Sequence, residues 1–383
     1  MSTVRPTPRF RLYVGVDSAA GTFTAAWMAP GPNATPGRAA TFDQAPQGFA
    51  RVQARRRASG QQPADILVVM EATGSYWIAL ATTLAQAGFV VSVVNPAQAH
   101  HVAKALLRRA TTDAIDARTL TPLAALLQPA PWTPPPAVYA DLQPRLAQRD
   151  TLIGLCQQVR NQLPALTHLP VVIAAVRARM EALIATLDAQ IEAVEGEIAE
   201  AIHLDEGWAA TATLLLSSTG IGLVTAAWLL VSTLNFTVCA TAEEATADAG
   251  LAPHPRESGT SVRGRAVISG GNKRLRTALS MATLSAGQHN PPIRDVYRRL
   301  RTAGKPKKVA RCAAARKLPH LAWAVVRTGQ AFDPLHAHRH RGSRGGFPLV
   351  GRSPTRHPAS PAPPLAQRTH DYHKLALDNQ YRI

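Results

Sequence analysis

The sequence is poor in cysteine and in aromatic residues. Its three cysteines, Cys156, Cys239 and Cys312, are too few and too far apart for a disulfide framework or a cysteine-based zinc site. We therefore expect a reducing compartment, the cytoplasm. Aromatic residues make up 5% of the chain and hydrophobic residues 46%, which excludes a wholly disordered or collagen-like protein and predicts cores packed by Ala, Leu and Val.

Targeting and membrane-spanning segments are also lacking. The start, MSTVRPTPRFRLYVGVD, has no long apolar run of the kind found in a signal peptide. Residues 207–242 carry no charge and exceed the roughly 20 residues needed to cross a bilayer, but Thr and Ser dilute this segment and Gly220 and Gly222 interrupt it. The sequence predicts a buried helical hairpin there, and no membrane partner.

Acidic residues are scarce in the last third of the chain. Residues 1–250 hold 17 Lys+Arg and 19 Asp+Glu, whereas residues 251–383 hold 25 and 5, so the net charge of +18 comes entirely from the C-terminal third. A one-sided excess of positive charge indicates binding to a polyanion, and nucleic acid fits best because no lipid-binding amphipathic helix accompanies it. We expect DNA as the partner.

Strand and helix patterns alternate over the first 130 residues. Short apolar runs predict strands over 11–17 and 22–28, forming a hairpin, and over 65–70 and 90–94. Helical patterns lie near 47–58, 76–87, 96–107 and 113–127. The fold class expected is a mixed α/β domain over residues 9–130, ended by the proline-rich segment PAPWTPPP at 129–136.

The remainder is predicted to be helical. Residues 137–206 show apolar residues at helical spacing, broken at Leu163-Pro164 and Leu169-Pro170, which predicts two or more helices as a coiled-coil arm for self-association or as ordinary core. Residues 207–333 form a mainly α domain. Residues 334–383 are rich in Pro, Gly, Arg and His and are predicted to be a disordered basic tail, whose HAHRHR run is a solvated segment rather than a metal site.

Four acidic residues stand where predicted elements begin or end. Asp17 ends the first strand, Glu71 follows the apolar run ILVVM, and Asp113 and Asp116 lie three apart at a helix start. Converging carboxylates bind hard divalent cations, and two Mg²⁺ ions about 4 Å apart can clamp the attacking and leaving oxygens of phosphoryl transfer. Alternatively, Asp113 caps its helix and Asp17 starts a turn.

Several motifs resemble the insertion sequence 110/116/902 family of transposases. They are the Asp17 hairpin, EATGSYW, VVNPAQAHHVAKALLRRATTDAIDARTLTPLA and GLAPHPRESGTSVRGRAVISGGNKRLRTAL, in the family's order and spacing. The resemblance implies a DEDD-type enzyme with a RuvC-like, ribonuclease H-fold domain followed by a helical transposase domain. It places Asp17, Glu71, Asp113 and Asp116 as the catalytic, Mg²⁺-binding acids. The basic residue that the family often shows before its third acid is Thr112 here.

Two further segments are expected to contact DNA. In LLLSSTGIGLVTAAWLL, Gly220 and Gly222 resemble a helix-hairpin-helix turn whose backbone N–H groups meet a phosphate, although a plain buried hairpin would use the same residues. Residues 250–279 place hydroxyls among cations, and on the resemblance Ser258 is the nucleophile, with Ser261 in reserve. Alternatively, these serines bond only the backbone. The cations expected to contact DNA are Arg256, Arg263, Arg265, Lys273, Arg274 and Arg276.

The resemblance implies a composite site in which Ser258 attacks a DNA phosphodiester with help from the acidic site. It also implies a structured guide RNA, a homo-oligomer (dimer or tetramer) and association with the bacterial nucleoid. The alternative is a RuvC-like structure-specific nuclease in which the acids activate water and Ser258 forms no covalent link.

Overall fold

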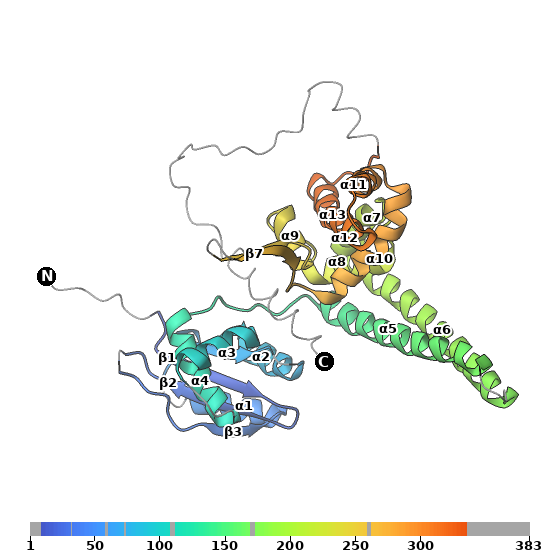
Figure 1. Ribbon diagram of the computed structural model, residues 1–383. Coiled ribbons are helices and arrows are strands. Elements are labelled where there is room, and N and C mark those ends of the chain that lie inside the picture. The colour runs from blue at the N-terminus through green and yellow to red at the C-terminus, as the bar shows by residue number, and fades with distance from the viewer. Residues whose placement is uncertain are drawn as a thin grey trace, which may run out of the picture. The chain divides into compact units, whose positions relative to one another are not determined.

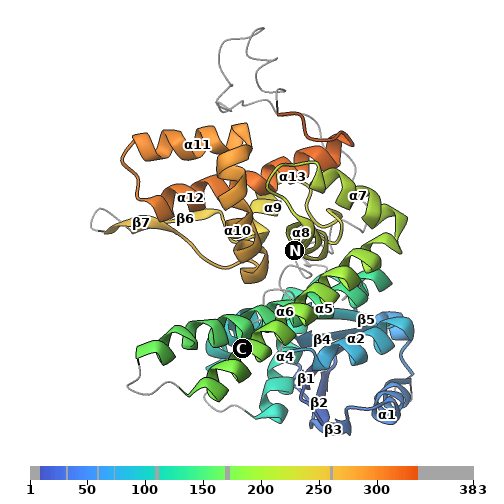
Figure 2. The same ribbon diagram turned by 90° about the vertical axis from the view of Figure 1, so that its right-hand side faces the viewer.

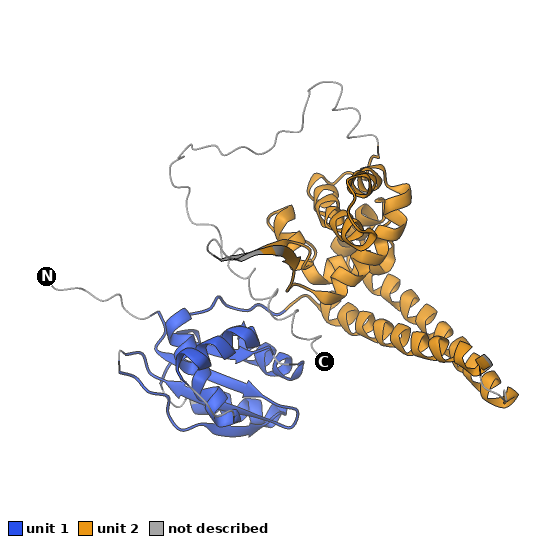
Figure 3. Cartoon of the chain, in the orientation of Figure 1, with its two compact units in different colours: residues 1–134, 359–383 blue, residues 135–358 orange. Residues whose placement is uncertain are grey.

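The computed structural model describes residues 9–31, 33–57, 60–72, 74–107, 112–168, 173–258 and 262–334. They form two compact units, which divide between Pro134 and Pro135 within the proline-rich segment (Figure 3). The predicted domains 137–206 and 207–333 lie together in the second unit, so their separation stays a prediction. The predicted tail lies, apart from residue 334, outside the described residues.

The first unit is built on a five-stranded sheet in the order β3-β2-β1-β4-β5 (Figure 2). The strands are β1 (Leu12–Ser18), β2 (Thr22–Met28), β3 (Ala40–Asp43), β4 (Ile66–Glu71) and β5 (Val90–Val94). The central β1 is antiparallel to β2 and parallel to β4, and β5 continues the parallel side. The α/β pattern and the β1–β2 hairpin are confirmed, whereas the short edge strand β3 was not predicted.

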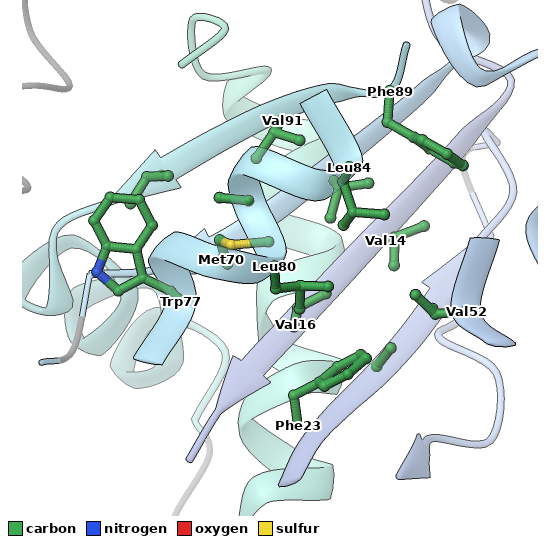
Figure 4. Close-up of a cluster of buried hydrophobic side chains, with 14 of the residues drawn as sticks. Val14, Val16, Phe23, Val52, Met70, Trp77, Leu80, Leu84, Phe89 and Val91 are labelled. Carbon is green, nitrogen blue, oxygen red and sulfur yellow. The ribbon is translucent and has the colours of Figure 1, made fainter. Parts of the chain in front are cut away.

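Helices cover both faces of this sheet, as the apolar character of its central strands requires. One face is covered by α1 (Pro46–Arg57) and α2 (Tyr76–Gln86), where Val16 and Met70 pack with Trp77 and Leu80 (Figure 4). The other face is covered by α3 (Pro96–Ala105) and α4 (Asp113–Leu127), where Leu67 packs with Leu123. A short 3₁₀ helix, η1 (Pro63–Asp65), leads into β4.

α4 lies close to β1 at Gly15. A Cβ atom at this position would lie 2.2 Å from the carbonyl oxygen of Ala117 and 2.7 Å from Cβ of Leu120. The absence of a side chain at Gly15 therefore lets the helix backbone rest directly on the strand.

The second unit begins with a pair of long helices, α5 (Ala137–Gln162) and α6 (Ala174–His203), which pack against each other (Figure 1). They are separated at the predicted proline break, where η2 (Pro164–His168) follows α5. Ion pairs join the two helices, including Arg149 Nε to Glu195 Oε1 at 2.6 Å and Arg160 Nη2 to Asp188 Oδ2 at 2.6 Å. The two predicted helices are confirmed, while self-association through them stays a prediction.

A helical bundle follows (Figure 2). Its helices are α7 (Glu206–Leu216), α8 (Leu223–Thr233), α9 (Ala242–Asp248), α10 (Lys273–His289), α11 (Pro291–Thr302), α12 (Lys307–Ala315) and α13 (Lys317–Thr328). α8 is buried throughout Thr225–Thr233, so the uncharged segment is a buried hairpin with α7, as predicted. Within the described ranges, none of the helices combines the length and hydropathy of a membrane-spanning segment.

The domain predicted to be mainly α over residues 207–333 also contains a pair of strands that was not predicted. A β-hairpin, β6 (Pro253–Ser258) and β7 (Val262–Ile268), stands between α9 and α10. Its strands carry Pro and Gly, which mask a strand pattern, and its ladder is irregular between His254 and Arg256.

Candidate functional site

Asp17 and Glu71 lie at one edge of the sheet. β1 ends at Ser18 and β4 at Glu71, and the parallel register pairs Val16 with Met70. The next residue of each strand is therefore one of the two acids. The sequence expectation that these side chains lie at neighbouring strand ends agrees with this register.

The other two acids lie in the first turn of α4. Asp113 and Asp116 are both in that turn, and α4 packs on β1, β2 and β4. Thr112 is the N-cap, because its Oγ1 accepts the backbone N–H of Ile115 at 3.3 Å. Asp113 is therefore not the capping residue. Thr112, which stands where the family often shows a basic residue, caps the helix instead.

Electrostatics shows that the four carboxylates share one neighbourhood. The pKa of Asp17 is raised from 3.8 to about 6, first by burial and then by the negative charges of Asp113, Asp116 and Glu71, while the backbone N–H of Ser18 opposes the shift. The pKa of Asp116 is also raised, by burial and by Asp113. Burial and the neighbouring negative charges therefore both favour the protonated form of Asp17.

These donors suit a hard divalent cation. All four are carboxylates, the ligand type that Mg²⁺ prefers, and a cation would relieve the repulsion that raises the pKa of Asp17. The hydroxyl of Ser18, next to Asp17, is buried without a hydrogen-bond partner. Among the described residues, no group of three or more acidic, His or Cys side chains is already arranged to hold a metal ion.

Ser258 is the last described residue of β6, and its backbone pairs with Val262. Ser261 lies outside the described residues. For Arg256, Arg263 and Arg265 the structure gives the strand position alone, with Arg256 opposite Gly264. The roles predicted for these four residues in β6 and β7 stay predictions.

Two of the cations expected to contact DNA have partners within the second unit. Arg274 Nη1 donates to Asp150 Oδ2 at 2.9 Å, and Arg276 Nη1 donates to the carbonyl oxygen of Gly270 at 2.6 Å. Sequence analysis missed Asp150, since nothing distinguishes it from other polar residues of α5. Lys273, the first residue of α10, is exposed.

Gly220 meets another helix of its own unit. With φ of +101°, it lies against α10, where an added Cβ would come within 2.5 Å of Cβ of Ala286. The Asn290 side chain donates to the carbonyl oxygen of neighbouring Thr219 at 3.0 Å. Packing within the unit therefore accounts for Gly220, as the alternative of a plain buried hairpin would have it, and a DNA contact by Gly220 and Gly222 stays a prediction. Gly222 is exposed, begins α8 and has open space around it.

Comparison with known proteins gives two family matches. Residues 14–169 match a model described as "Transposase", of the DEDD type, and residues 212–298 match "Transposase IS116/IS110/IS902 family". A pilin gene-inverting protein of Moraxella bovis is 30% identical over 326 residues, covering 84% of this chain and 98% of that protein. An insertion element IS110 protein of Streptomyces coelicolor is 30% identical over 192 residues, covering 50% of this chain and 45% of that one.

Solved structures were also compared. The Thermus thermophilus RuvC structure aligns with a TM-score of 0.24 and 14% sequence identity, covering 30% of this chain and 96% of that chain.

Proposed function

Because the chain belongs to the IS116/IS110/IS902 family of transposases, we propose that it cuts and rejoins DNA with a metal-binding acidic site and a serine nucleophile. The observation that carries the acidic site is the pKa of Asp17, raised to about 6 by burial and by three other carboxylates. Such clustering of like charge is costly in a folded protein and is typical of catalytic centres.

Asp17, Glu71, Asp113 and Asp116 would hold Mg²⁺. When bound, the metal supplies positive charge that stabilises the phosphorane-like transition state and lowers the pKa of an attacking oxygen. The contribution of the chain itself is to position the four carboxylates. The sheet holds Asp17 and Glu71 side by side, and α4 brings Asp113 and Asp116 to them. The sheet order with an antiparallel β2 beside β1 supports a RuvC-like, ribonuclease H-type domain.

The serine step rests on the family resemblance. Oγ of Ser258 would attack the phosphorus of a phosphodiester, forming a protein–DNA ester while the bond to one DNA oxygen breaks. That oxygen leaves as a hydroxyl after taking up a proton. A hydroxyl of the target strand then displaces the serine by the reverse reaction, so the number of ester bonds is conserved.

The guide RNA and the oligomer also rest on that resemblance. We propose that a structured RNA encoded beside the reading frame selects the DNA sites, and that a dimer or tetramer assembles the composite site. The nucleoid would then be the place of action.

The test uses a plasmid that carries this reading frame with its native flanks, so that DNA ends and any flanking RNA are present. Asp17→Ala should abolish Mg²⁺-dependent strand cleavage, because it removes the acid that the other three carboxylates surround. Asp43→Ala is the matched control, since Asp43 is exposed and ends β3 in the same sheet. Equal activity of Asp17→Ala and wild type would contradict the acidic site.

Covalent trapping separates the serine mechanism from the nuclease alternative. The alternative is favoured by one observation: all four acids lie in the first unit and can position water without Ser258. Denaturing gels should show a protein–DNA adduct in wild type that is absent in Ser258→Ala. If wild type cuts DNA without an adduct, water is the nucleophile.

A further inference from the structure

Basic residues are concentrated at the end of α11, at the start of α12 and in the turn between them. Between residues 298 and 311 the chain holds Arg298, Arg299, Arg301, Lys305, Lys307, Lys308 and Arg311. Asp295 is the single acidic residue from position 273 to position 328. Neither the acidic site nor the serine segment uses this concentration of charge.

Six of these cations are exposed, and all but Lys305 lie on the two helices. We call those five the α11–α12 cationic surface: Arg298, Arg299, Lys307, Lys308 and Arg311. None of the five forms an ion pair with any carboxylate in the part of the chain that the structure describes. Arg301 differs, because its guanidinium donates to the carbonyl oxygen of Lys305 and closes the turn. The five charges are thus available to an external anion.

The surface stands on a packed scaffold. α11 and α12 contact each other and both contact α10 (Figure 2). Ile293 on α11 and Ala310 and Ala314 on α12 are buried, which fixes the opposite faces of the two helices. The cations therefore hold a defined spacing, unlike those of a solvated basic run.

The start of α12 points to an anionic ligand as well. Lys307 and Lys308 are its first two residues, Pro306 provides no side-chain cap, and the first bond of the helix runs from Ala310 N–H to the Pro306 carbonyl. Lysines at the positive end of a helix are unfavourable, because their charge has the same sign as the helix dipole there. A phosphate there would meet both the ammonium groups and the free N–H groups of the first turn.

We propose that the α11–α12 cationic surface binds the phosphodiester backbone of duplex DNA, without reading its sequence. This rests on the proposed function in that DNA is the substrate. Duplex is favoured over single strands because no exposed aromatic side chain accompanies the five cations for bases to stack on; Tyr297 is half-buried. Its five cations are not among the residues assigned to the acidic site or to the serine segment.

The test is the salt dependence of binding by the full-length protein to a duplex DNA of about 30 base pairs with unrelated sequence. Each phosphate contact costs about 3.5-fold in affinity when salt rises from about 50 to about 200 mM. The triple variant Arg298→Gln/Arg299→Gln/Arg311→Gln should lose less affinity than wild type when salt rises over this range. If all three arginines contact phosphates, the two losses should differ by up to about 40-fold. The low-salt affinity should fall as well.

Two matched variants control this result. Arg298→Lys/Arg299→Lys/Arg311→Lys keeps the charge and should keep the salt slope, since phosphate accepts either cation. Arg51→Gln/Lys104→Gln/Arg179→Gln removes the same net charge from exposed positions on three other helices and should bind nearly as wild type does. Circular dichroism and the thermal midpoint establish that each variant is folded.

The proposal is overturned if the Gln variant keeps the wild-type salt slope, or if the variant with scattered substitutions loses as much of that slope as the Gln variant does. It is also overturned if the Gln substitutions weaken binding to an RNA duplex of the same length but not to the DNA duplex. Cleavage measured at saturating protein keeps this result apart from the proposed function. Should Asp17→Ala cleave normally while the Gln variant still loses its salt slope, the proposed chemistry fails and the binding surface stands.

Discussion

Replacing Asp17 by Asn should stabilise the metal-free protein while abolishing its activity. Asp17 has a pKa of about 6 in the folded chain against an ordinary value of 3.8. A raised pKa means that the folded state holds its proton more tightly than the unfolded state does. Its contribution to stability is complete below about pH 4 and is lost as pH rises to about 6.

The magnitude follows from the size of the shift. The full difference corresponds to about 3 kcal/mol above pH 6. Because the carboxylate is partly exposed, solvent screening reduces this to about 1–2 kcal/mol. The asparagine side chain carries no charge at any pH, so Asp17→Asn should gain this amount at pH 7.5 and nothing below about pH 4.

Hydrogen exchange measured by mass spectrometry on peptides covering Leu12–Ser18 reports the local opening of β1 in the full chain. At pH 7.5, without divalent cations, Asp17→Asn should exchange about 5–30-fold more slowly than wild type. Adding Mg²⁺ should slow exchange in wild type and leave the variant unchanged. Asp43→Asn, which changes an exposed carboxylate at the end of β3, should alter neither.

The reasoning is refuted if Asp17→Asn exchanges faster than wild type at pH 7.5. It is also refuted if the difference between the two is the same at pH 4 and pH 7.5, since the effect then does not come from ionisation.

Two further predictions concern the second unit. Gly220→Ala should destabilise this unit by about 2–4 kcal/mol, because φ is +101° and the new methyl group would overlap α10. Gly222→Ala has open space and should cost under about 1 kcal/mol. Thermal unfolding compares the two variants, and equal midpoints would disprove the packing role of Gly220. Arg274→Gln should cost about 1–3 kcal/mol, because it removes the nearer of two arginines that face half-buried Asp150, at 2.9 Å against 3.7 Å for Arg149. Asp150→Asn in the same background should recover part of this loss, and additive losses in the double-mutant cycle would show that the Arg274–Asp150 pair contributes nothing.

The sheet was predictable because its apolar runs are short, strong and bounded. β2 and β5 begin and end at the predicted residues, and β1, β4 and α2 are displaced by about a residue. β3 has four residues at the edge of the sheet with Phe42 alone buried, so no periodic pattern marks it. In β6 and β7, Pro and Gly hide the strand signal, and the pairing of residues across the turn, rather than composition, defines the hairpin.

The sequence predicted which acidic residues stand at strand ends and at a helix start, but not the tertiary contacts of the other predicted site residues. Strand ends and a helix start place acids at a common edge, and these positions follow from apolar runs and from a capping threonine. Which residues contact each other depends on the tertiary fold, and no local sequence pattern indicates contacts between distant residues. Asp150 lies 124 residues from Arg274, and Gly220 lies 66 residues from the alanine it packs against.

Gly15 makes the height of α4 above β1 depend on a single hydrogen atom. The third and fourth acids are carried by that helix, so their distance from Asp17 depends on how closely α4 approaches β1 at Gly15. One methyl group added at position 15 would displace α4 from β1, and with it Asp113 and Asp116 from Asp17. A residue without a functional group thus sets the spacing of the proposed metal ligands.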